Sequence, residues 1–162
     1  IVRAVGERLR LVAVVVDADP ATLRRLRDEV GIRWLQLHGD ESPPTLARWL
    51  PEAYKAVRPA APEDLVAARR FGGAELLVDA RVASAPGGTG VRADWDLARR
   101  LARERPVWLA GGLTPENVAD AVAAVRPSGV DVASGVEVAP GRKDPARVRA
   151  FLRRARRAHA EG

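Results

Sequence analysis

Residues 107–118, VWLAGGLTPENV, join a short apolar run to two glycines and a helix-start signal. The run Val107–Ala110 has the length and composition of a buried strand. In Thr114-Pro115-Glu116 a capping residue precedes a proline, and proline is favoured at the first position of a helix. We therefore predict a strand that turns into a helix through Gly111-Gly112.

The same unit recurs along the chain. Apolar runs begin at residues 11, 34, 54, 76, 107 and 130, so their starts are 20 to 31 residues apart. One strand, one helix and two short loops occupy about that length. The predicted strands are Leu11–Val16, Trp34–Leu37, Tyr54–Val57, Leu76–Val78, Val107–Ala110 and Val130–Ala133. Helix starts are predicted at Asp19-Pro20, Ser42-Pro43, Pro62-Glu63-Asp64, Thr114-Pro115-Glu116 and Asp144-Pro145.

Alternation of strands and helices predicts an α/β fold with a parallel sheet. The runs are largely apolar, as expected for strands that are buried on both faces. The pattern by itself fits an open, doubly wound sheet and a closed barrel equally. No linker or low-complexity block interrupts the chain, so we expect one domain over residues 1–162.

The composition excludes several classes of protein and site. The 162 residues contain no cysteine, which excludes a disulfide scaffold, a thiolate metal site and a cysteine nucleophile within them. The longest apolar run, Leu11–Val16, is far shorter than the roughly 18 residues of a membrane helix, so no membrane partner is expected. The net charge is +6, and the final predicted helix carries Arg149, Arg153, Arg154, Arg156 and Arg157. A solvated helix face and a nucleic-acid surface are the two interpretations; without a recognition motif we expect no nucleic-acid partner.

Gly-bearing turns follow the last two predicted strands. Gly111-Gly112 follows one of them and Ser134-Gly135 follows the other. Glycine lets backbone N–H groups approach an anion closely, and a helix start adds a positive dipole. For either pair alone, a tight turn is the favoured explanation. Two such turns in consecutive final units favour a phosphate-binding site.

Two titratable side chains also lie at predicted strand ends. Asp79 follows Leu76–Val78, where partial burial raises a carboxyl pKa and allows the group to donate a proton. A helix cap or a loop salt bridge is the alternative role for Asp79. His38 follows Trp34–Leu37 and is either a site residue or a structural hydrogen-bonding group between loops.

Taken together, the motifs resemble those of a known enzyme family. QLHGDE (36–41), Asp79 followed by GGTG (87–90), LAGGLTPENV (109–118) and GVDVASGVE (129–137) occur in this order. This combination resembles the phosphoribosylanthranilate isomerases of tryptophan biosynthesis, which are (β/α)8 TIM barrels. The resemblance implies a TIM-barrel type of α/β fold in which the six predicted units are units three to eight. It also implies a cytoplasmic protein that is a monomer or a homodimer.

The resemblance further implies a reaction and a set of site residues. The family converts N-(5-phosphoribosyl)anthranilate to the carboxyphenylamino-deoxyribulose phosphate by an Amadori rearrangement, an aldose–ketose isomerisation without a metal or organic cofactor. Asp79 matches the general acid that opens the sugar ring. The implied phosphate-binding residues are Gly111, Gly112, Ser134 and Gly135, and the implied substrate-binding residues are Gln36, His38 and Asp131. The GGTG loop is implied to close over the substrate.

This chain also departs from the family pattern. Family members begin with a strand bearing lysine-isoleucine-cysteine-glycine, whose cysteine is the base, and their second unit bears an arginine that holds the anthranilate carboxylate. Neither occurs at a matching place in the 162 residues, which begin with isoleucine. We expect Ile1–Arg10 to be the tail of a second helix, and two further units would bring the chain to about 206 residues. The 162 residues alone are then expected to be inactive.

Two other functions fit part of the pattern. One is a phosphate-binding fragment of such a barrel without activity. The other is a different sugar-phosphate barrel enzyme, such as indole-glycerol-phosphate synthase. That family uses a lysine on an early strand, and the QLHGDE motif argues against it.

Overall fold

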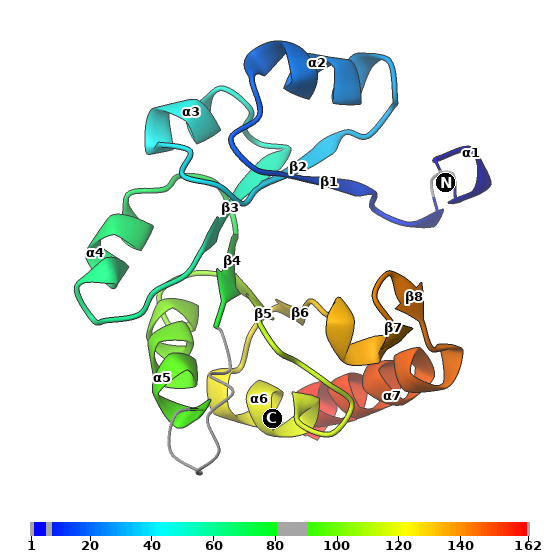
Figure 1. The fold of residues 1–162 in the computed structure, drawn as a ribbon. Coiled ribbons are helices and arrows are strands. Elements are labelled where there is room, and N and C mark those ends of the chain that lie inside the picture. The colour runs from blue at the N-terminus through cyan, green and yellow to red at the C-terminus, as the bar shows by residue number, and fades with distance from the viewer. Residues whose placement is uncertain (1, 6–7, 81–90, 162) are drawn as a thin grey trace.

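A single curved parallel sheet organises the molecule. The computed structural model describes residues 2–5, 8–80 and 91–161. Six strands are hydrogen-bonded in the order in which they occur along the chain (Figure 1). They are β1 Val12–Val15, β2 Trp34–Leu37, β3 Ala53–Val57, β4 Leu76–Asp79, β5 Val107–Ala110 and β6 Gly129–Val130. This confirms the α/β class and the parallel sheet.

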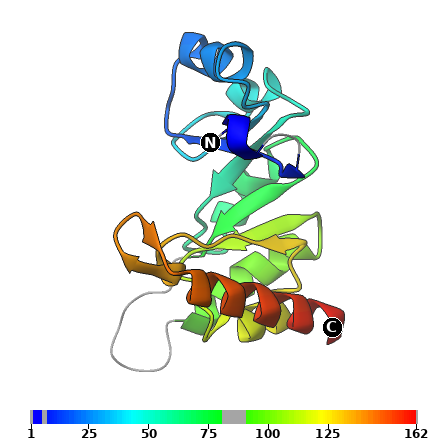
Figure 2. The same cartoon turned by 90° about the vertical axis from the view of Figure 1, so that its right-hand side faces the viewer.

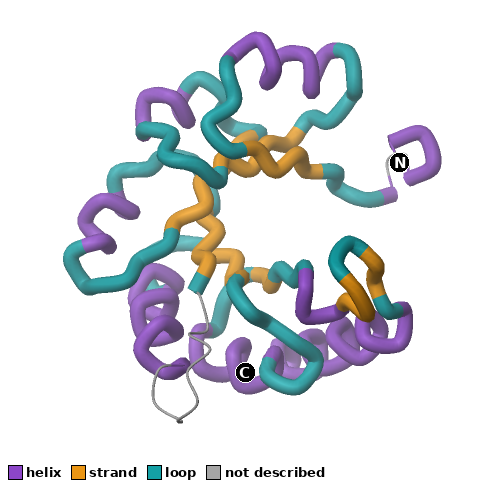
Figure 3. The backbone as a smooth tube through the Cα atoms, in the orientation of Figure 1, coloured by secondary structure: helices purple, strands orange, loops and turns teal. Residues whose placement is uncertain are grey.

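Helices cover the outer side of the sheet, and β1 and β6 are its two edge strands. Figure 3 shows the strands as an open arc with the helices around it, and Figure 2 shows the long last helix lying across the final strands. The helices are α1 Val2–Val5, α2 Pro20–Asp28, α3 Pro43–Ala47, α4 Asp64–Arg69, α5 Val91–Ala102, α6 Val118–Val125 and α7 Pro145–Glu161. The arc is therefore part of a barrel wall rather than a flat doubly wound sheet.

Alternate residues of each strand face opposite sides, and both sides are apolar. On the outer side, one cluster includes Leu23, Leu35 and Leu37 beneath α2 and α3. A second, larger cluster includes Leu109 and Val122 beneath the later helices. The inner side carries a third cluster, made of Tyr54, Ala56, Leu77 and Ala110 with Val12, Trp34 and Trp108 packed against it. Burial on both faces explains why the strands are continuously apolar.

Charged and aromatic groups close the amino end of the inner face. The Arg10 guanidinium lies 4.4 Å from the centre of the Trp34 ring and forms a 2.9 Å ion pair with Glu75. The indole N–H of Trp108 donates to the same carboxylate over 2.8 Å. The charged and aromatic side chains at this end of the sheet therefore contact one another. The carboxyl ends of the strands are the opposite end of the sheet.

Three of the predicted helix starts are confirmed by their caps. Asp19 accepts hydrogen bonds from the N–H groups of Ala21 and Thr22 ahead of α2. Ser42 accepts one from Thr45 ahead of α3, and Asp144 accepts one from Ala146 ahead of α7. Each cap satisfies a backbone donor that the first helical turn leaves free.

The helix predicted from Thr114 begins later, at Val118. The Asn117 side chain accepts from the Thr114 N–H and donates to the Gly112 carbonyl, so a turn precedes the helix. This turn holds the loop after β5 against the start of α6.

The last predicted strand, Val130–Ala133, was too long. Strand β6 ends at Val130, and after one more bond, from the Asp131 N–H to Leu109 O, the chain enters a 3-10 turn at Ser134–Val136. An unpredicted hairpin follows, formed by β7 Glu137–Ala139 and β8 Arg142–Lys143. Its turn contains Gly141 at a φ of 76°, a left-handed conformation that glycine adopts without strain.

The basic last helix packs through part of its apolar face. Phe151 and Ala155 are buried, whereas the neighbouring Leu152 is exposed. Arg154 donates to the Pro115 carbonyl and Arg157 forms an ion pair with Glu161. Among the described residues, no helix combines the length and apolar character that a membrane span requires.

Candidate functional site

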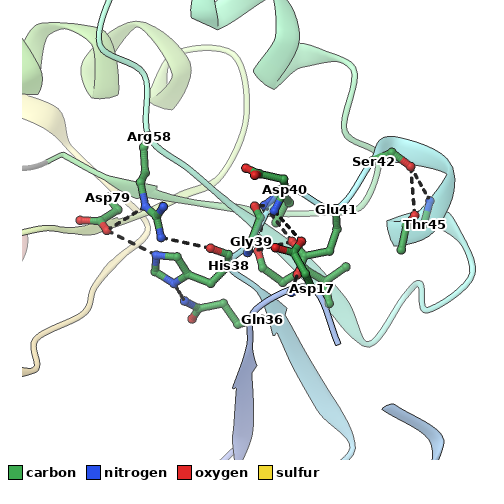
Figure 4. A network of polar contacts seen from close by, with 12 residues as sticks. Asp17, Gln36, His38, Gly39, Asp40, Glu41, Ser42, Thr45, Arg58 and Asp79 are labelled. Carbon is green, nitrogen blue, oxygen red and sulfur yellow. Dashed lines mark hydrogen bonds and ion pairs between the residues drawn. The ribbon is translucent and has the colours of Figure 1, made fainter. Parts of the chain in front are cut away.

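Polar side chains converge where the first four strands end. Asp17 follows β1, His38 follows β2, Arg58 follows β3, and Asp79 is the last residue of β4. Because these strands are parallel and adjacent, their carboxyl ends meet at one edge of the sheet. Figure 4 shows the side chains of His38, Arg58 and Asp79 pointing toward one another there.

Asp79 is held through one carboxylate oxygen. Its Oδ2 lies 3.3 Å from Nε2 of His38 and 3.5 Å from Nε of Arg58. The Arg58 guanidinium also donates to the His38 carbonyl over 3.0 Å. The side chains of His38 and Asp79 are each 19% exposed, so the pair is enclosed and still accessible to a small molecule.

Behind His38, two buried side chains continue the network. The Gln36 amide nitrogen lies 2.7 Å from Nδ1 of His38, and the Tyr54 hydroxyl donates to the Gln36 amide oxygen over 3.0 Å. Burial raises the pKa of Tyr54 to about 12, with further contributions from the negative charges of Asp131 and Glu75. Tyr54 is therefore a phenol, and a hydrogen-bond donor, at any physiological pH.

A second network joins the ends of β1, β2 and β3. The Glu41 carboxylate accepts from the N–H groups of Asp17 and Gly39 over 2.9 Å each, and lies 3.1 Å from Nζ of Lys55. Lys55 also donates to the Gly39 carbonyl over 2.6 Å. Both side chains are 5% exposed. Burial favours the neutral acid, but the hydrogen bonds from Asp17 and Lys55 outweigh it and lower the pKa of Glu41.

The loop after β2 packs closely on Asp17 in the same network. The Asp40 N–H donates to the Asp17 carboxylate over 2.7 Å, and Asp17 itself has a φ of 47°. A Cβ at Gly39 would overlap the Asp17 backbone nitrogen at 2.7 Å. Glycine is thus required where the His38 loop passes Asp17, and this contact fixes the backbone next to His38.

Asp131 directly follows β6, the edge strand on the opposite side of the sheet from β1. Its N–H donates to the Leu109 carbonyl over 2.8 Å, directly after β6. The residue keeps an exposed surface, yet desolvation of the carboxyl raises its pKa, and repulsion by Asp79 adds to this effect. Asp131 and Asp79 therefore influence each other electrostatically across the inner face.

The two Gly-bearing turns lie side by side. A Cβ at Gly135 would collide with the Leu113 carbonyl oxygen, which places the turn after β6 directly against the turn after β5. Gly111 and Gly112 have φ values of 94° and 64°. Among the backbone hydrogen bonds of loops and turns in the described residues, none is donated by the N–H groups of Gly111 or Gly112, and Ser134 and Gly135 begin a 3-10 turn, whose first N–H groups have no acceptor within the turn. Adjacent N–H groups of this kind are the chemical requirement of an anion site.

The structure thus brings three of the predicted site residues, Gln36, His38 and Asp79, into one hydrogen-bonded chain. The Asp131 carboxylate interacts with them through charge, and the predicted phosphate-binding glycines form a pair of adjacent turns, of which Gly111 lies against Asp79. Their predicted roles in binding and catalysis stay predictions. The GGTG loop, residues 87–90, lies outside the described residues. Among the described residues, no three His, Asp or Glu side chains are grouped to hold a metal ion.

Sequence reasoning missed the contributions of Tyr54 and Arg58. Tyr54 was counted only as part of a strand, because a tyrosine in an apolar run reads as core. Arg58 lies one residue beyond the predicted strand Tyr54–Val57 and was not among the predicted site residues. The one available signal was that strand alternation places Tyr54 and Arg58 on the same face, four residues apart.

Comparisons with known proteins agree with this arrangement. The family model described as N-(5'phosphoribosyl)anthranilate (PRA) isomerase matches residues 1–154. The N-(5'-phosphoribosyl)anthranilate isomerase of Myxococcus xanthus is 48% identical over 151 residues, covering 90% of this chain and 71% of the relative. These matches extend across both networks and both Gly-bearing turns.

Two solved structures have the same fold over most of this chain. A phosphoribosylanthranilate isomerase in complex with reduced 1-(o-carboxyphenylamino)-1-deoxyribulose 5-phosphate is 32% identical, with a TM-score of 0.74, and the match covers 90% of this chain and 70% of that one. A monomeric form of the dimeric enzyme from Thermotoga maritima is 30% identical, with a TM-score of 0.76 over 94% of this chain and 75% of that one. The chain therefore belongs to the N-(5'-phosphoribosyl)anthranilate isomerase family.

Proposed function

We propose that the protein acts on N-(5-phosphoribosyl)anthranilate in tryptophan biosynthesis and isomerises its aminoaldose to an aminoketose, with Asp79 as the general acid. The observation that carries this proposal is the position of Asp79. It ends a buried strand at the open side of the sheet, held on one oxygen by His38 and coupled by charge to Asp131.

In the proposed reaction, Asp79 gives its proton to the ring oxygen of the ribose. The bond between that oxygen and the first sugar carbon breaks, while the nitrogen lone pair forms the double bond of a protonated Schiff base. Asp79 is then a carboxylate, and the donors of His38 and Arg58 on Oδ2 stabilise this charge. A base next removes the proton from the second sugar carbon, and the resulting enolamine tautomerises to the ketone.

We assign the substrate phosphate to the N–H groups of Gly111, Gly112, Ser134 and Gly135. Adjacency of the two turns and the left-handed conformations of the first two residues support this assignment. Asp131 would orient the substrate amine or a hydroxyl. Gln36 and His38 lie on the wall of the same site, His38 with an accessible ring.

By the family pattern the base is a cysteine. These 162 residues contain no cysteine, so they do not supply that base. We therefore propose that the 162-residue chain alone binds the phosphate end of the substrate but does not turn it over. A fusion that adds two N-terminal strand–helix units, the first with the cysteine-bearing strand of the family pattern, would supply the base and extend the arc toward a closed barrel.

Turnover of N-(5-phosphoribosyl)anthranilate by the chain and by the fusion tests this proposal. Binding of the reduced product analogue is measured on both by calorimetry. We expect analogue binding by both proteins and turnover by the fusion only. Analogue binding without turnover by the fusion would favour a phosphate-binding fragment. If neither protein binds the analogue, the assigned site is wrong.

A further inference from the structure

Four side chains form a directional line of hydrogen bonds that ends on Asp79. The line runs from Tyr54 on β3 to Gln36 and His38 at the end of β2, and then to Asp79 on β4 (Figure 4 shows its last three members). Tyr54 is 8% exposed and Gln36 5%. Because the far end is buried, the groups that determine its direction are protein groups.

The direction of the line is set by the orientation of the Gln36 amide. Its oxygen accepts from the Tyr54 hydroxyl over 3.0 Å, and that hydroxyl stays protonated because burial raises the pKa of Tyr54 to about 12. With its oxygen engaged there, Gln36 presents its amide nitrogen to His38, 2.7 Å from Nδ1. An amide nitrogen can only donate, so Nδ1 must be the lone-pair nitrogen of the imidazole.

The tautomer of His38 follows from this contact. A neutral imidazole carries one proton, and if Nδ1 accepts, the proton is on Nε2. Nε2 faces Oδ2 of Asp79 at 3.3 Å and donates to it. The charged groups that face His38 are Asp79 and Arg58, with Asp131 acting at longer range.

The other oxygen of Asp79, Oδ1, lies beside the turn after β5. In the described part of the chain, His38 and Arg58 both contact Oδ2. Oδ1 lies against Gly111, since a Cβ built on that glycine would be 2.7 Å from it. Gly111 belongs to the turn assigned to the phosphate. A proton on Oδ1 would thus lie beside the turn assigned to the substrate phosphate.

We infer that Tyr54 and Gln36 are positioning residues that act through His38: they fix its Nε2–H tautomer, which anchors Oδ2 of Asp79 and leaves Oδ1 to deliver the proton. The role of Oδ1 in catalysis rests on the proposed function. The tautomer and its dependence on Gln36 are properties of the folded chain and can be tested without turnover.

Nitrogen-15 NMR of the histidine rings tests the inference. The chain has two histidines, His38 and His159, and His159 is exposed near the end of α7, so it serves as an internal reference. His38→Gln assigns the signals. At the high-pH limit of the titration we expect the Nε2–H form of His38 to exceed the Nδ1–H form by about tenfold or more, the size of one hydrogen bond. His159 should show a weaker preference.

Two substitutions carry the decisive comparison, because an ordinary imidazole also favours Nε2–H modestly. In Gln36→Glu a carboxylate replaces the donor, and we expect His38 to move its proton to Nδ1. In Tyr54→Phe the amide loses its anchor, and we expect the preference to fall toward that of His159. The ring signals of His159 should not change in either variant.

An Nδ1–H form in the unsubstituted chain would overturn the inference. So would an unchanged His38 tautomer in Tyr54→Phe, which keeps the ring and is the milder substitution if Gln36→Glu does not fold. Binding of the reduced product analogue is measured in parallel. Failure to bind it would count against the proposed function and leave the tautomer result standing.

Discussion

Replacing Glu41 by glutamine should destabilise the fold far more than the same substitution on the surface. In the structure, the carboxylate accepts from two backbone N–H groups and from buried Lys55. The amide oxygen of Glu41→Gln can still accept from Asp17. Its nitrogen then faces the Gly39 N–H and the Lys55 ammonium, so donors oppose donors.

The magnitude follows from these two losses. One buried backbone donor loses its acceptor, and one buried ammonium loses its counter-charge. Breaking a buried ion pair on one side costs about 3–5 kcal/mol, which is a large part of the roughly 5–15 kcal/mol that stabilises a typical domain. We expect a loss of about 3–5 kcal/mol in the free energy of unfolding, and a melting temperature lower by roughly 10 °C.

Urea unfolding at neutral pH measures the effect, and Glu104→Gln is the matched control. Glu104 forms a two-bonded ion pair with Arg69, but both side chains are at least 40% exposed. Exposed pairs contribute about 1 kcal/mol or less. If the free energies of unfolding of Glu41→Gln and Glu104→Gln differ by less than about 1 kcal/mol, the buried network of Glu41 and Lys55 does not stabilise the strand ends as described.

Acid should remove the difference between Glu41→Gln and the unsubstituted chain. The folded pKa of Glu41 lies below its ordinary value of 4.5. Its stabilising contribution is therefore complete above that value and is lost as pH falls through the folded pKa. The two unfolding curves should converge in strong acid, and a difference that persists there would have another cause.

Four further results are expected. Asp79→Asn in the active fusion should lower turnover by about a hundredfold or more while analogue binding is kept; near-normal turnover would remove Asp79 from the mechanism. Gly135→Ala should destabilise by about 2 kcal/mol or more in urea unfolding, because its Cβ meets the Leu113 carbonyl; an unchanged midpoint would contradict the packing of the two turns. Because the folded pKa of Asp131 is raised, ionisation of this group as the pH rises destabilises the fold. Asp131→Asn should therefore have a higher melting temperature than the unsubstituted chain at pH 7 and the same melting temperature in strong acid. The 162-residue chain should associate in size-exclusion chromatography through edge strand β1, where Val14 is 61% exposed; a monomer would oppose this.

Local signals in the sequence predicted most of the fold. Asp19 and Ser42 were recognisable as helix caps because a cap and its partners lie within four residues. Strands β2 and β5 were predicted to the residue, since both have a neighbouring strand on each side and both are largely apolar. Edge strand β6 was overextended, because Val130–Ala133 is apolar enough for a strand but has only one neighbouring strand with which to pair.

The site was predicted in part, and the missing parts are long-range. Asp79 and His38 were identifiable because strand-end positions have a known meaning in parallel sheets. The contact between Tyr54 and Gln36 joins residues 18 apart, and the pair of Lys55 and Glu41 joins residues 14 apart. Nothing in the local pattern distinguishes Lys55 from a surface lysine until the strands are placed side by side.

The separate outer clusters have a consequence for how the molecule opens. One cluster packs α2 and α3 on the first strands, and the other packs the later helices on the last strands. In the described part of the chain, strand β3 joins the two halves, because Ala53 belongs to one outer cluster and Val57 packs against the other, and the inner cluster also crosses this boundary. A sub-global opening at this boundary would separate the two outer clusters. His38 belongs to one half and Asp79 to the other. Such an opening would break the contact between His38 and Asp79 and abolish the function of the site while the rest of the chain is still folded.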